Sequence, residues 1–389
     1  MKRSIPTIVS LVIIIAIGIA VFWNMRKAPP EGGAPIVATS TPSGSTPTIP
    51  AVTVVVDNLE IPWDIAFLPS AAGASAKEVG DMLVTERPGS LIRIARDGSR
   101  KEIPIVGVKR GGEGGLLGIV LHPDFEENRL LYLYLGVSDG NGTTNRIERY
   151  RFLNDALSDK KVIISGIPGA LYHDGGRMEF GADGMLYVTT GDATKEDIAQ
   201  DKNSLGGKIL RLNDDGSIPG DNPFPGSPVW SYGHRNPQGL AWDGAGRLWE
   251  TEHGPTGENQ ECCRDEINLI EKGGNYGWPT ITGAETRTGM LSPALQSGGS
   301  DTWAPASLAY YKGSLFFGGL RGAALYEAVL DGTRVKELKK HFDGEFGRIR
   351  TVRLGPDGML YLTTSNRDGR WEAKDGGDKV IRVNPAALR

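Results

Sequence analysis

Met185-Leu-Tyr-Val-Thr-Thr190 is a short run of apolar and β-branched residues that follows a tight turn at Asp183-Gly184. A run of this kind, bounded by turn residues, is typical of a β-strand. The same pattern recurs at intervals of 45 to 67 residues, in the stretches 82–87, 130–135, 247–252, 314–319 and 359–364. That interval suits propeller blades with loop insertions, so we interpret the six stretches as one strand repeated six times.

A second strand follows each repeated stretch. Apolar and polar residues alternate along this strand, and an arginine faces outward in 90–94, 208–212 and 379–383. In the other three units the equivalent strands are 146–150, 266–270 and 324–328. Six paired units predict an all-β fold, a six-bladed β-propeller of four-stranded antiparallel blades. A β-sandwich is the alternative, but two packed sheets do not require six similar units.

The two ends of this region are expected to meet. The early strand 52–56 precedes the first unit, and the last unit ends with 379–383. Pairing these two strands would remove an open sheet edge, which otherwise invites aggregation. We therefore expect the propeller to span 51–389.

The N-terminus has a different composition. Lys2 and Arg3 precede an apolar run at 8–23, which predicts a signal anchor or a signal peptide over 1–27. A small-residue site at Gly18-Ile19-Ala20 leaves cleavage open, although the run continues past it and favours an uncleaved anchor. Residues 28–50 are rich in Pro, Ser and Thr and predict a flexible linker. We expect an extracytoplasmic protein, periplasmic or on the cell surface, attached to a membrane through the N-terminal segment only.

The overall composition is that of a soluble globular protein. Hydrophobic residues make up 39% of the 389 residues and charged residues 23%, while 54 Gly and 24 Pro fit many tight turns. The net charge is −4 and there is no long basic run, so we expect no nucleic-acid partner.

Histidines mark the candidate functional loops. The chain has five, and His122, His173, His234 and His253 lie in segments rich in glycine or turn residues. Loops at one face of a rigid scaffold are where binding and catalytic residues concentrate.

These segments belong to a longer series of motifs that runs through 51–389. The series comprises Gly114-Gly-Leu-Leu-Gly118, His173-x-Gly-Gly-Arg177, Gly191-Asp192, Gly233-His-Arg-Asn-Pro-Gln-Gly239, Gly254-Pro255, Asp265-Glu-Ile-Asn268 and Gly274-Asn-Tyr-Gly-Trp-Pro279. In this order it resembles the soluble PQQ-dependent aldose sugar dehydrogenases, the glucose/sorbosone dehydrogenase family. The resemblance implies oxidation of an aldose at C1 to a lactone with pyrroloquinoline quinone (PQQ) and Ca²⁺, and an external electron acceptor such as a quinone, a cytochrome or a dye.

The resemblance makes His173 the general base that removes the C1 hydroxyl proton while hydride passes to PQQ. Histidine suits this role because its pKa lies near working pH. The alternative is a turn histidine bonded to the backbone. Asp192 corresponds to the family's carboxylate in the sugar pocket, and its alternative is a turn-capping aspartate.

PQQ is a planar tricarboxylate, and the guanidinium fork of arginine matches carboxylates in paired fashion. The resemblance assigns Arg235 and Asn236 to the cofactor, and Arg321 as a further cation. Arg348 and Arg350 alternate on one strand, so both point to the same face, which is unfavourable unless an anion lies between them. The alternative for this pair is a solvated face.

Calcium prefers oxygen donors, including carbonyls exposed in tight turns. By resemblance, the carbonyl groups of Gly254 and Pro255 bind the Ca²⁺ that also contacts PQQ. A second, structural Ca²⁺ is implied at the Glu266 side chain and the Tyr276 backbone. Its alternative is a local Asp-Glu turn.

Three positions are particular to this chain. Glu113 stands where well-known family members have Gln and would bind the quinone or the sugar, and Tyr172 stands where they have Asp. Both changes bear on substrate preference more than on the cofactor. The adjacent pair Cys262-Cys263 suggests a vicinal disulfide that stiffens the loop beside the Ca–PQQ site, and the alternative is two buried free thiols.

Two other functions fit a six-bladed propeller. One is a Ca²⁺-dependent lactonase-type hydrolase, which would need carboxylates and Asn around its metal where this chain has arginines. The other is a binding propeller without catalytic activity. His173, Arg235, Arg348 and Arg350 argue against a scaffold that has lost its chemistry.

Overall fold

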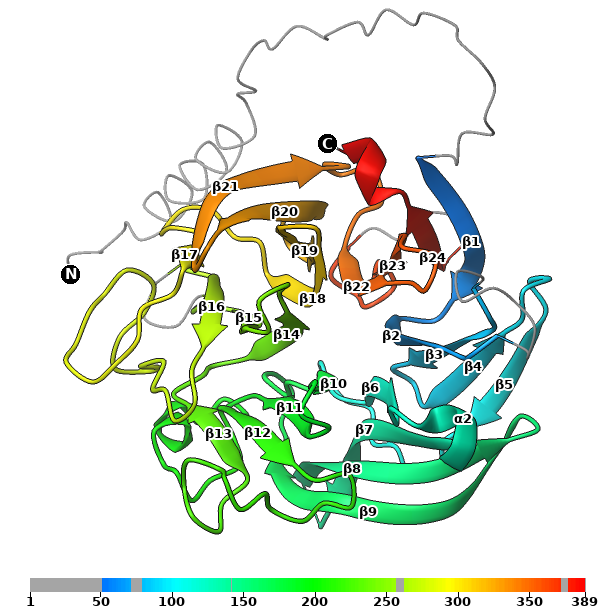
Figure 1. Ribbon diagram of the computed structural model, residues 1–389, viewed down its shortest axis with the longest axis horizontal. Helices are drawn as coiled ribbons and strands as arrows, with labels where there is room; N and C mark the ends of the chain where they lie inside the picture. The colour runs from blue at the N-terminus through cyan, green and yellow to red at the C-terminus, as the bar shows by residue number, and fades with distance from the viewer. Residues whose placement is uncertain (1–50, 71–78, 141, 257–261, 372–376, 389) are drawn as a thin grey trace, which may run out of the picture. The chain divides into compact units, whose positions relative to one another are not determined.

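The repeated stretches are second strands of four-stranded sheets in the computed structural model, which describes residues 51–70, 79–140, 142–256, 262–371 and 377–388. The described residues form six such sheets, arranged as blades around a common centre (Figure 1). The first three blades contain β2 (Pro62–Phe67), β3 (Met82–Glu86), β4 (Ser90–Ile94), β5 (Arg100–Pro104); β6 (Leu116–Leu121), β7 (Leu130–Asp139), β8 (Gly142–Leu153), β9 (Ala156–Pro168); and β10 (Met178–Phe180), β11 (Leu186–Thr190), β12 (Lys208–Leu212), β13 (Val229–Tyr232).

The last three blades follow the same order. They contain β14 (Pro237–Trp242), β15 (Leu248–Glu252), β16 (Glu266–Ile270), β17 (Leu295–Gln296); β18 (Pro305–Tyr311), β19 (Ser314–Gly319), β20 (Ala324–Asp331), β21 (Arg334–His341); and β22 (Ile349–Leu354), β23 (Leu360–Thr364), β24 (Asp378–Val383), β1 (Val52–Leu59). Short helical turns lie at α2 (Phe125–Asn128), η1 (Glu196–Ala199) and η3 (Pro385–Leu388). All neighbouring strands within a blade pair antiparallel, so the predicted propeller is confirmed.

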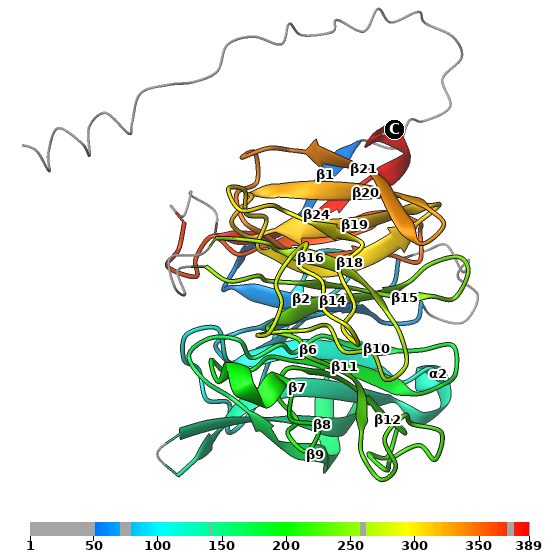
Figure 2. The ribbon, with the colours of Figure 1, turned by 90° about the vertical axis from the view of Figure 1, so that its left-hand side faces the viewer.

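The inner strands form a closed ring. β2, β6, β10, β14, β18 and β22 each contact the next, and β22 contacts β2. The ring closes because β1 pairs antiparallel with β24, with Val52 opposite Val383. The expectation that the N-terminal strand completes the last blade is therefore confirmed. Figure 2 shows the blades from the side.

The arginines that we predicted to face outward on the third strands pair with aspartates. Arg211 is 4% exposed and pairs with Asp183 at 2.9 Å, and Arg382 pairs with Asp357 at 2.7 Å. Arg93 makes the same pair with Asp81. Each aspartate lies in the turn before the second strand, so a recurring ion pair joins that turn to the third strand. Such a pair removes the charge of the arginine from the outer face.

The N-terminal part of the chain lies outside this description. The predicted signal segment 1–27 and linker 28–50 are not among the described residues and stay predictions. In the part of the chain that the structure describes, no helix is long and apolar enough to cross a bilayer.

Candidate active site

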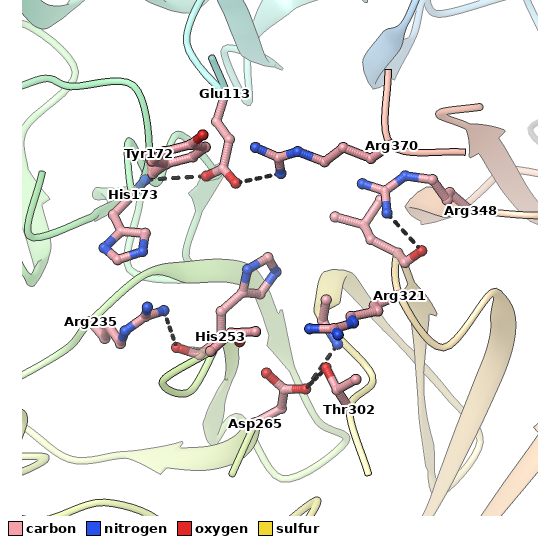
Figure 3. A pocket seen from close by; sticks show the side chains of 13 residues that line it. Glu113, Tyr172, His173, Arg235, His253, Asp265, Thr302, Arg321, Arg348 and Arg370 are labelled. Atoms are coloured by element: carbon pink, nitrogen blue, oxygen red, sulfur yellow. Dashed lines mark hydrogen bonds and ion pairs between the residues drawn. The ribbon is translucent and has the colours of Figure 1, made fainter. Parts of the chain in front are cut away.

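A cavity of about 550 Å³ opens at one end of the propeller (Figure 3). It is lined by Glu113, Tyr172, His173, Arg235, His253, Thr256, Asp265, Thr302, Ala304, Leu320, Arg321, Arg348 and Arg370. These residues lie in loops that join neighbouring blades or that join the second to the third strand of one blade. In an antiparallel blade both kinds of loop emerge at the same end, which is why residues far apart in the sequence meet here.

His173 lies in the wall of the cavity, on the loop between β9 and β10. Its Nδ1 is 2.7 Å from Asp192 Oδ1, and the other oxygen of Asp192 accepts a 2.8 Å hydrogen bond from Trp278 Nε1. A carboxylate on Nδ1 holds the proton there, which leaves Nε2 as the nitrogen that can accept one. Gly175 and Gly176, which follow His173, adopt the left-handed conformation that glycine tolerates, with φ of 65° and 107°.

We predicted that Asp192 lies in the sugar pocket, but it is not among the residues that line the cavity. Asp192 is 1% exposed, and its oxygens are engaged by His173, Trp278 and the backbone N–H of Thr194. The residue therefore lies behind the imidazole and orients it instead of contacting the sugar. The Gly-Asp motif located the residue but could not show which way its side chain points.

Glu113 and Arg370 form an ion pair in the cavity wall. Arg370 Nη1 donates to Glu113 Oε1 at 2.8 Å, and the Arg370 guanidinium lies 5.3 Å from the centre of the Tyr172 ring. The other oxygen of Glu113 accepts the backbone N–H of His173 at 3.1 Å. Burial acts to raise the pKa of Glu113, but the charge of His253 and the hydrogen bond from Arg370 lower it to about 2. Glu113 is therefore ionised at neutral pH.

The predicted cations Arg321, Arg348 and Arg350 all lie around this cavity, at two depths. Arg321 and Arg348 line the main cavity. Arg350 lies deeper, 5.7 Å from the centre of the Trp63 ring, and lines a smaller cavity that shares Glu113 and His253 with the main one.

These arginines have different partners. Arg348 pairs with Asp368 at 2.7 Å, while Arg350 Nη1 donates to Gln238 Oε1 at 3.4 Å. The alternative of a solvated face does not hold for Arg348 and Arg350, since the two residues are 5% and 4% exposed.

The buried polar atoms around the cavity fit an anionic ligand. Within the described residues, Arg350 Nε and His253 Nε2 have no hydrogen-bond partner. Burial lowers the pKa of Arg350 to about 9, so the guanidinium still has its charge at neutral pH. Burial also lowers the pKa of His253 to about 3, so that imidazole is neutral and can donate from one nitrogen. A carboxylate-bearing cofactor would satisfy both groups.

Arg235 and Asn236 lie on the loop between β13 and β14. Arg235 lines the main cavity, and its guanidinium stacks over Trp278 at 5.3 Å and donates to the His253 carbonyl at 3.3 Å. Asn236 is buried, and its side-chain oxygen accepts the backbone N–H of Gly175 at 3.2 Å. The structure thus brings the predicted cofactor residues and His173 to one place.

The predicted calcium residues also meet. Gly254, Pro255, Glu266 and Tyr276 line one small cavity of about 10 Å³ beside the main one. Burial and the neighbouring Glu252 raise the pKa of Glu266 to about 8. An ion that offers positive charge would offset this cost, so the carboxylate and the nearby carbonyl groups fit the oxygen donor set that Ca²⁺ prefers.

Cys262 and Cys263 are joined by a disulfide in the structure. Cys263 is fully buried, and Cys262 forms an isolated bridge with Thr256, which lines the main cavity. The disulfide therefore lies next to the cavity wall, as the sequence interpretation expected.

Several site residues were not singled out from the sequence. Arg370, Asp368 and Trp63 lie in segments without a recognisable motif, and their roles depend on which loops the propeller brings together. Trp278 was part of a quoted motif, yet its bond to Asp192 crosses 86 residues. His253 was noted because it lies in a segment rich in glycine or turn residues, and this segment was the sequence signal that pointed to it.

Comparisons with known proteins identify the family of this chain. A family model described as Glucose / Sorbosone dehydrogenase matches residues 59–372. The aldose sugar dehydrogenase YliI of Escherichia coli (strain K12) is 34% identical, with 90% of this chain and 97% of that protein covered. Quinoprotein glucose dehydrogenase B of Acinetobacter calcoaceticus is also 34% identical, over 61% of this chain and 54% of that protein.

A solved structure supports the same relation. The PQQ-bound form of aldose sugar dehydrogenase from Streptomyces coelicolor is 40% identical and superposes with a TM-score of 0.76, covering 86% of this chain and 98% of that one. The fold, the cavity and these relatives define an oxidoreductase of the sugar dehydrogenase class. The chain belongs to the glucose/sorbosone dehydrogenase family, which confirms the resemblance of its motifs.

Proposed function

We propose that this protein oxidises aldose sugars at C1 to lactones, with PQQ as cofactor, Ca²⁺ as its metal and an external acceptor for the two electrons. The observation that supports this most is the His173–Asp192 pair in the wall of a cavity lined by arginines. The names of the relatives, aldose sugar dehydrogenase and quinoprotein glucose dehydrogenase, agree with it.

His173 acts as the general base. With Nδ1–H donated to Asp192, its Nε2 takes the proton of the C1 hydroxyl, and Asp192 stabilises the imidazolium that forms. PQQ, when bound, supplies a two-electron acceptor for the hydride that leaves C1. The depth of Asp192 and its bond to Trp278 keep the imidazole in one orientation throughout.

The remaining side chains bind and orient. Arg235, Asn236, Arg321, Arg348 and Arg350 would hold the carboxylates and the ring of PQQ, and Gly254 and Pro255 would offer carbonyl groups to Ca²⁺. Glu113, fixed by Arg370, would accept hydrogen bonds from the sugar or the quinone. Glu266 and the Tyr276 backbone would hold a structural Ca²⁺.

Reconstitution tests this proposal. Apo-protein is supplied with PQQ, with Ca²⁺ or with both, and dye reduction is measured on a panel of aldoses. Activity should require both additions and should be lost in His173→Ala, while His341→Ala, on the outer strand β21, should keep it. Lactone hydrolysis without PQQ would instead indicate the hydrolase, and PQQ-independent sugar binding without turnover would indicate the binding propeller.

The location of the protein is also our proposal. We infer an extracytoplasmic protein with membrane attachment through 1–27, supported by the apolar run at 8–23 and by the disulfide, which persists in oxidising compartments. Fractionation of cells that express the full chain tests it, and recovery in the cytosolic fraction would contradict it.

A further inference from the structure

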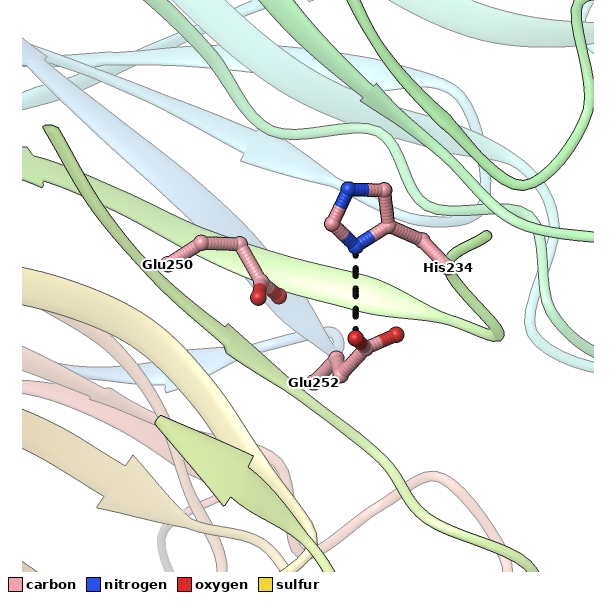
Figure 4. A group of neighbouring side chains, drawn as sticks. All are labelled: His234, Glu250 and Glu252. Atoms are coloured by element: carbon pink, nitrogen blue, oxygen red, sulfur yellow. Dashed lines mark hydrogen bonds and ion pairs between the residues drawn. The ribbon is translucent and has the colours of Figure 1, made fainter. Parts of the chain in front are cut away.

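Three buried side chains meet next to the cavity, beside its lining residues Arg235 and His253 in the sequence. His234 precedes β14, and Glu250 and Glu252 lie on β15 (Figure 4). Their exposed fractions are 0%, 0% and 4%. One nitrogen of the imidazole and one oxygen of each carboxylate all lie within 4.8 Å of one another.

The amide of Asn268 cannot satisfy this cluster. Its Nδ2 lies 3.1 Å from Glu250, 3.1 Å from Glu252 and 3.2 Å from Glu266, yet an amide nitrogen has two hydrogens for these three carboxylates. Within the described residues, Glu250 Oε1 and Asn268 Oδ1, both in fully buried side chains, have no hydrogen-bond partner. A buried carboxylate oxygen without a partner, next to a second buried carboxylate, indicates a missing positive group.

The imidazole of His234 is oriented as a metal ligand would be. Nε2 lies 2.8 Å from Ser231 Oγ, and Nδ1 faces Glu252 at 3.2 Å. If Nε2–H donates to the serine, the lone pair of Nδ1 points at the two carboxylates. The Tyr276 ring stacks on the imidazole at 4.6 Å and fixes its plane. A bond from the second ring nitrogen is the usual way in which proteins orient a ligating histidine.

We propose that His234, Glu250 and Glu252 bind a divalent transition-metal cation of the Zn²⁺ or Mn²⁺ class, with Asn268 as an additional oxygen ligand when its amide is turned. The nitrogen donor distinguishes this site from the all-oxygen calcium sites proposed above, which it adjoins because Glu252 also lines the small cavity with Glu266 and Tyr276. Two donors to one Zn²⁺ lie at most about 4.2 Å apart, twice the metal–nitrogen bond, so binding draws the three groups slightly closer.

The site would act on the cofactor loop without touching the cofactor. Glu252 Oε2 accepts the backbone N–H of Arg235 at 2.8 Å, so a cation on Glu252 and His234 would hold both that N–H and the residue before Arg235. The residues would therefore be positioning residues for that arginine. Because the site does not depend on PQQ, its test is metal content and not activity.

The experiment uses the full-length protein, produced in medium with added Zn²⁺ or Mn²⁺ because the donors are buried. Metal per chain is measured by inductively coupled plasma mass spectrometry after gel filtration, in wild type, Glu250→Gln and Glu327→Gln. Glu327 is a matched control, because it is a buried carboxylate 3.1 Å from His341 in another blade. We expect one equivalent in wild type and Glu327→Gln, and at least a fivefold loss in Glu250→Gln.

A second measurement needs no variant. Pulsed electron paramagnetic resonance of the Mn²⁺-loaded wild type, with excess Ca²⁺ present, should detect coupling to one imidazole nitrogen. Wild type that contains no Zn²⁺ or Mn²⁺ overturns the proposal, and so does bound Mn²⁺ that shows no nitrogen coupling or is displaced by Ca²⁺. Equal metal content in Glu250→Gln and wild type overturns it as well.

Discussion

Asp192 holds the imidazole of His173 through a 2.7 Å hydrogen bond, and Trp278 in turn holds Asp192. In Asp192→Asn the shape of the side chain is kept, but the amide no longer stabilises a protonated imidazole. We expect kcat to fall by roughly 10²- to 10⁴-fold, the range that a positioned general base contributes. The KM for the sugar should stay near the wild-type value, because Asp192 is buried behind the base.

Steady-state dye reduction by the PQQ- and Ca²⁺-loaded variant provides the measurement. Asp183→Asn is the matched control, because Asp183 lies in the same blade at the turn before β11 and should leave kcat unchanged. A rise in KM with unchanged kcat in Asp192→Asn would mean that Asp192 contacts the sugar after all.

Glu113 should make the free energy of unfolding depend on pH in the acid range. Its pKa is about 2 in the folded protein against an ordinary 4.5, so its contribution is present above pH 4.5 and is lost as the pH falls toward 2. The shift corresponds to about 3 kcal/mol of unfolding free energy. Urea unfolding between pH 4.5 and pH 2 should show a smaller loss of unfolding free energy in Glu113→Gln and in Arg370→Gln than in wild type. Glu126→Gln, on α2, should follow wild type. Parallel curves for all four proteins would contradict the ion pair.

At the residue scale, motifs located His173 and the arginines around the cavity but not their partners. The identity of Glu113 was readable as a charged substitution for glutamine. Its partner Arg370 is 257 positions away and belongs to no motif, so only the closed ring brings the two together. For Asp192, the sequence predicted that the residue belongs to the site but not the direction in which its side chain points.

At the scale of elements, β1 and β24 close the last blade. Val56 on β1 is 5% exposed and packs with residues of the first and last blades, whereas Val54 is 49% exposed. Val56→Asp buries an unpaired charge and should lower the unfolding free energy by about 3 kcal/mol or more. Val54→Asp should change it by less than about 1 kcal/mol. Urea titration measures the unfolding free energy of both variants. Similar losses in Val56→Asp and Val54→Asp would show that β1 does not contribute a buried face.

The loop with Cys262 and Cys263 offers a simpler check. Because the structure pairs the two cysteines, protein that is denatured without a reductant should take up no alkylating reagent, and protein that is reduced and denatured should take up two equivalents. Intact-mass spectrometry counts the labels. Two labels on protein that is denatured without a reductant would mean that the buried-thiol alternative is correct.

At the scale of elements, the sequence predicted the features that repeat from blade to blade. The third-strand arginines Arg93, Arg211 and Arg382 recur with the period of the strands, and each pairs with an aspartate in the turn before the second strand. Alternation alone predicted that those arginines face outward. It could not show that each arginine reaches back to the aspartate, because that contact depends on the register of two strands and not on one.

At the scale of the molecule, hydroxyl groups join one blade to the next near the inner strands. Thr85 donates to the Leu117 carbonyl at 2.6 Å, Thr251 to Ala306 at 2.7 Å, and Thr351 to Trp63 at 2.5 Å across the point of closure. The cavity depends on this closure, since Glu113, His173, Arg235, Arg321 and Arg348 come from loops that enter five different blades. The blade count was predictable from the repeats, whereas the depth of each side chain was not.

A ligand that contacts several blades should stabilise the whole ring. PQQ with Ca²⁺ at a hundredfold excess over Kd contributes about 2.7 kcal/mol, which raises Tm by roughly 5 °C. Arg321→Ala should leave the Tm of the apo-protein unchanged, because Arg321 is exposed, and should reduce the ligand-induced shift to half or less. Arg334→Ala, an exposed arginine on β21 of the same blade, should keep the full shift. Differential scanning calorimetry measures both, and an equal shift in the two variants would remove Arg321 from the cofactor site.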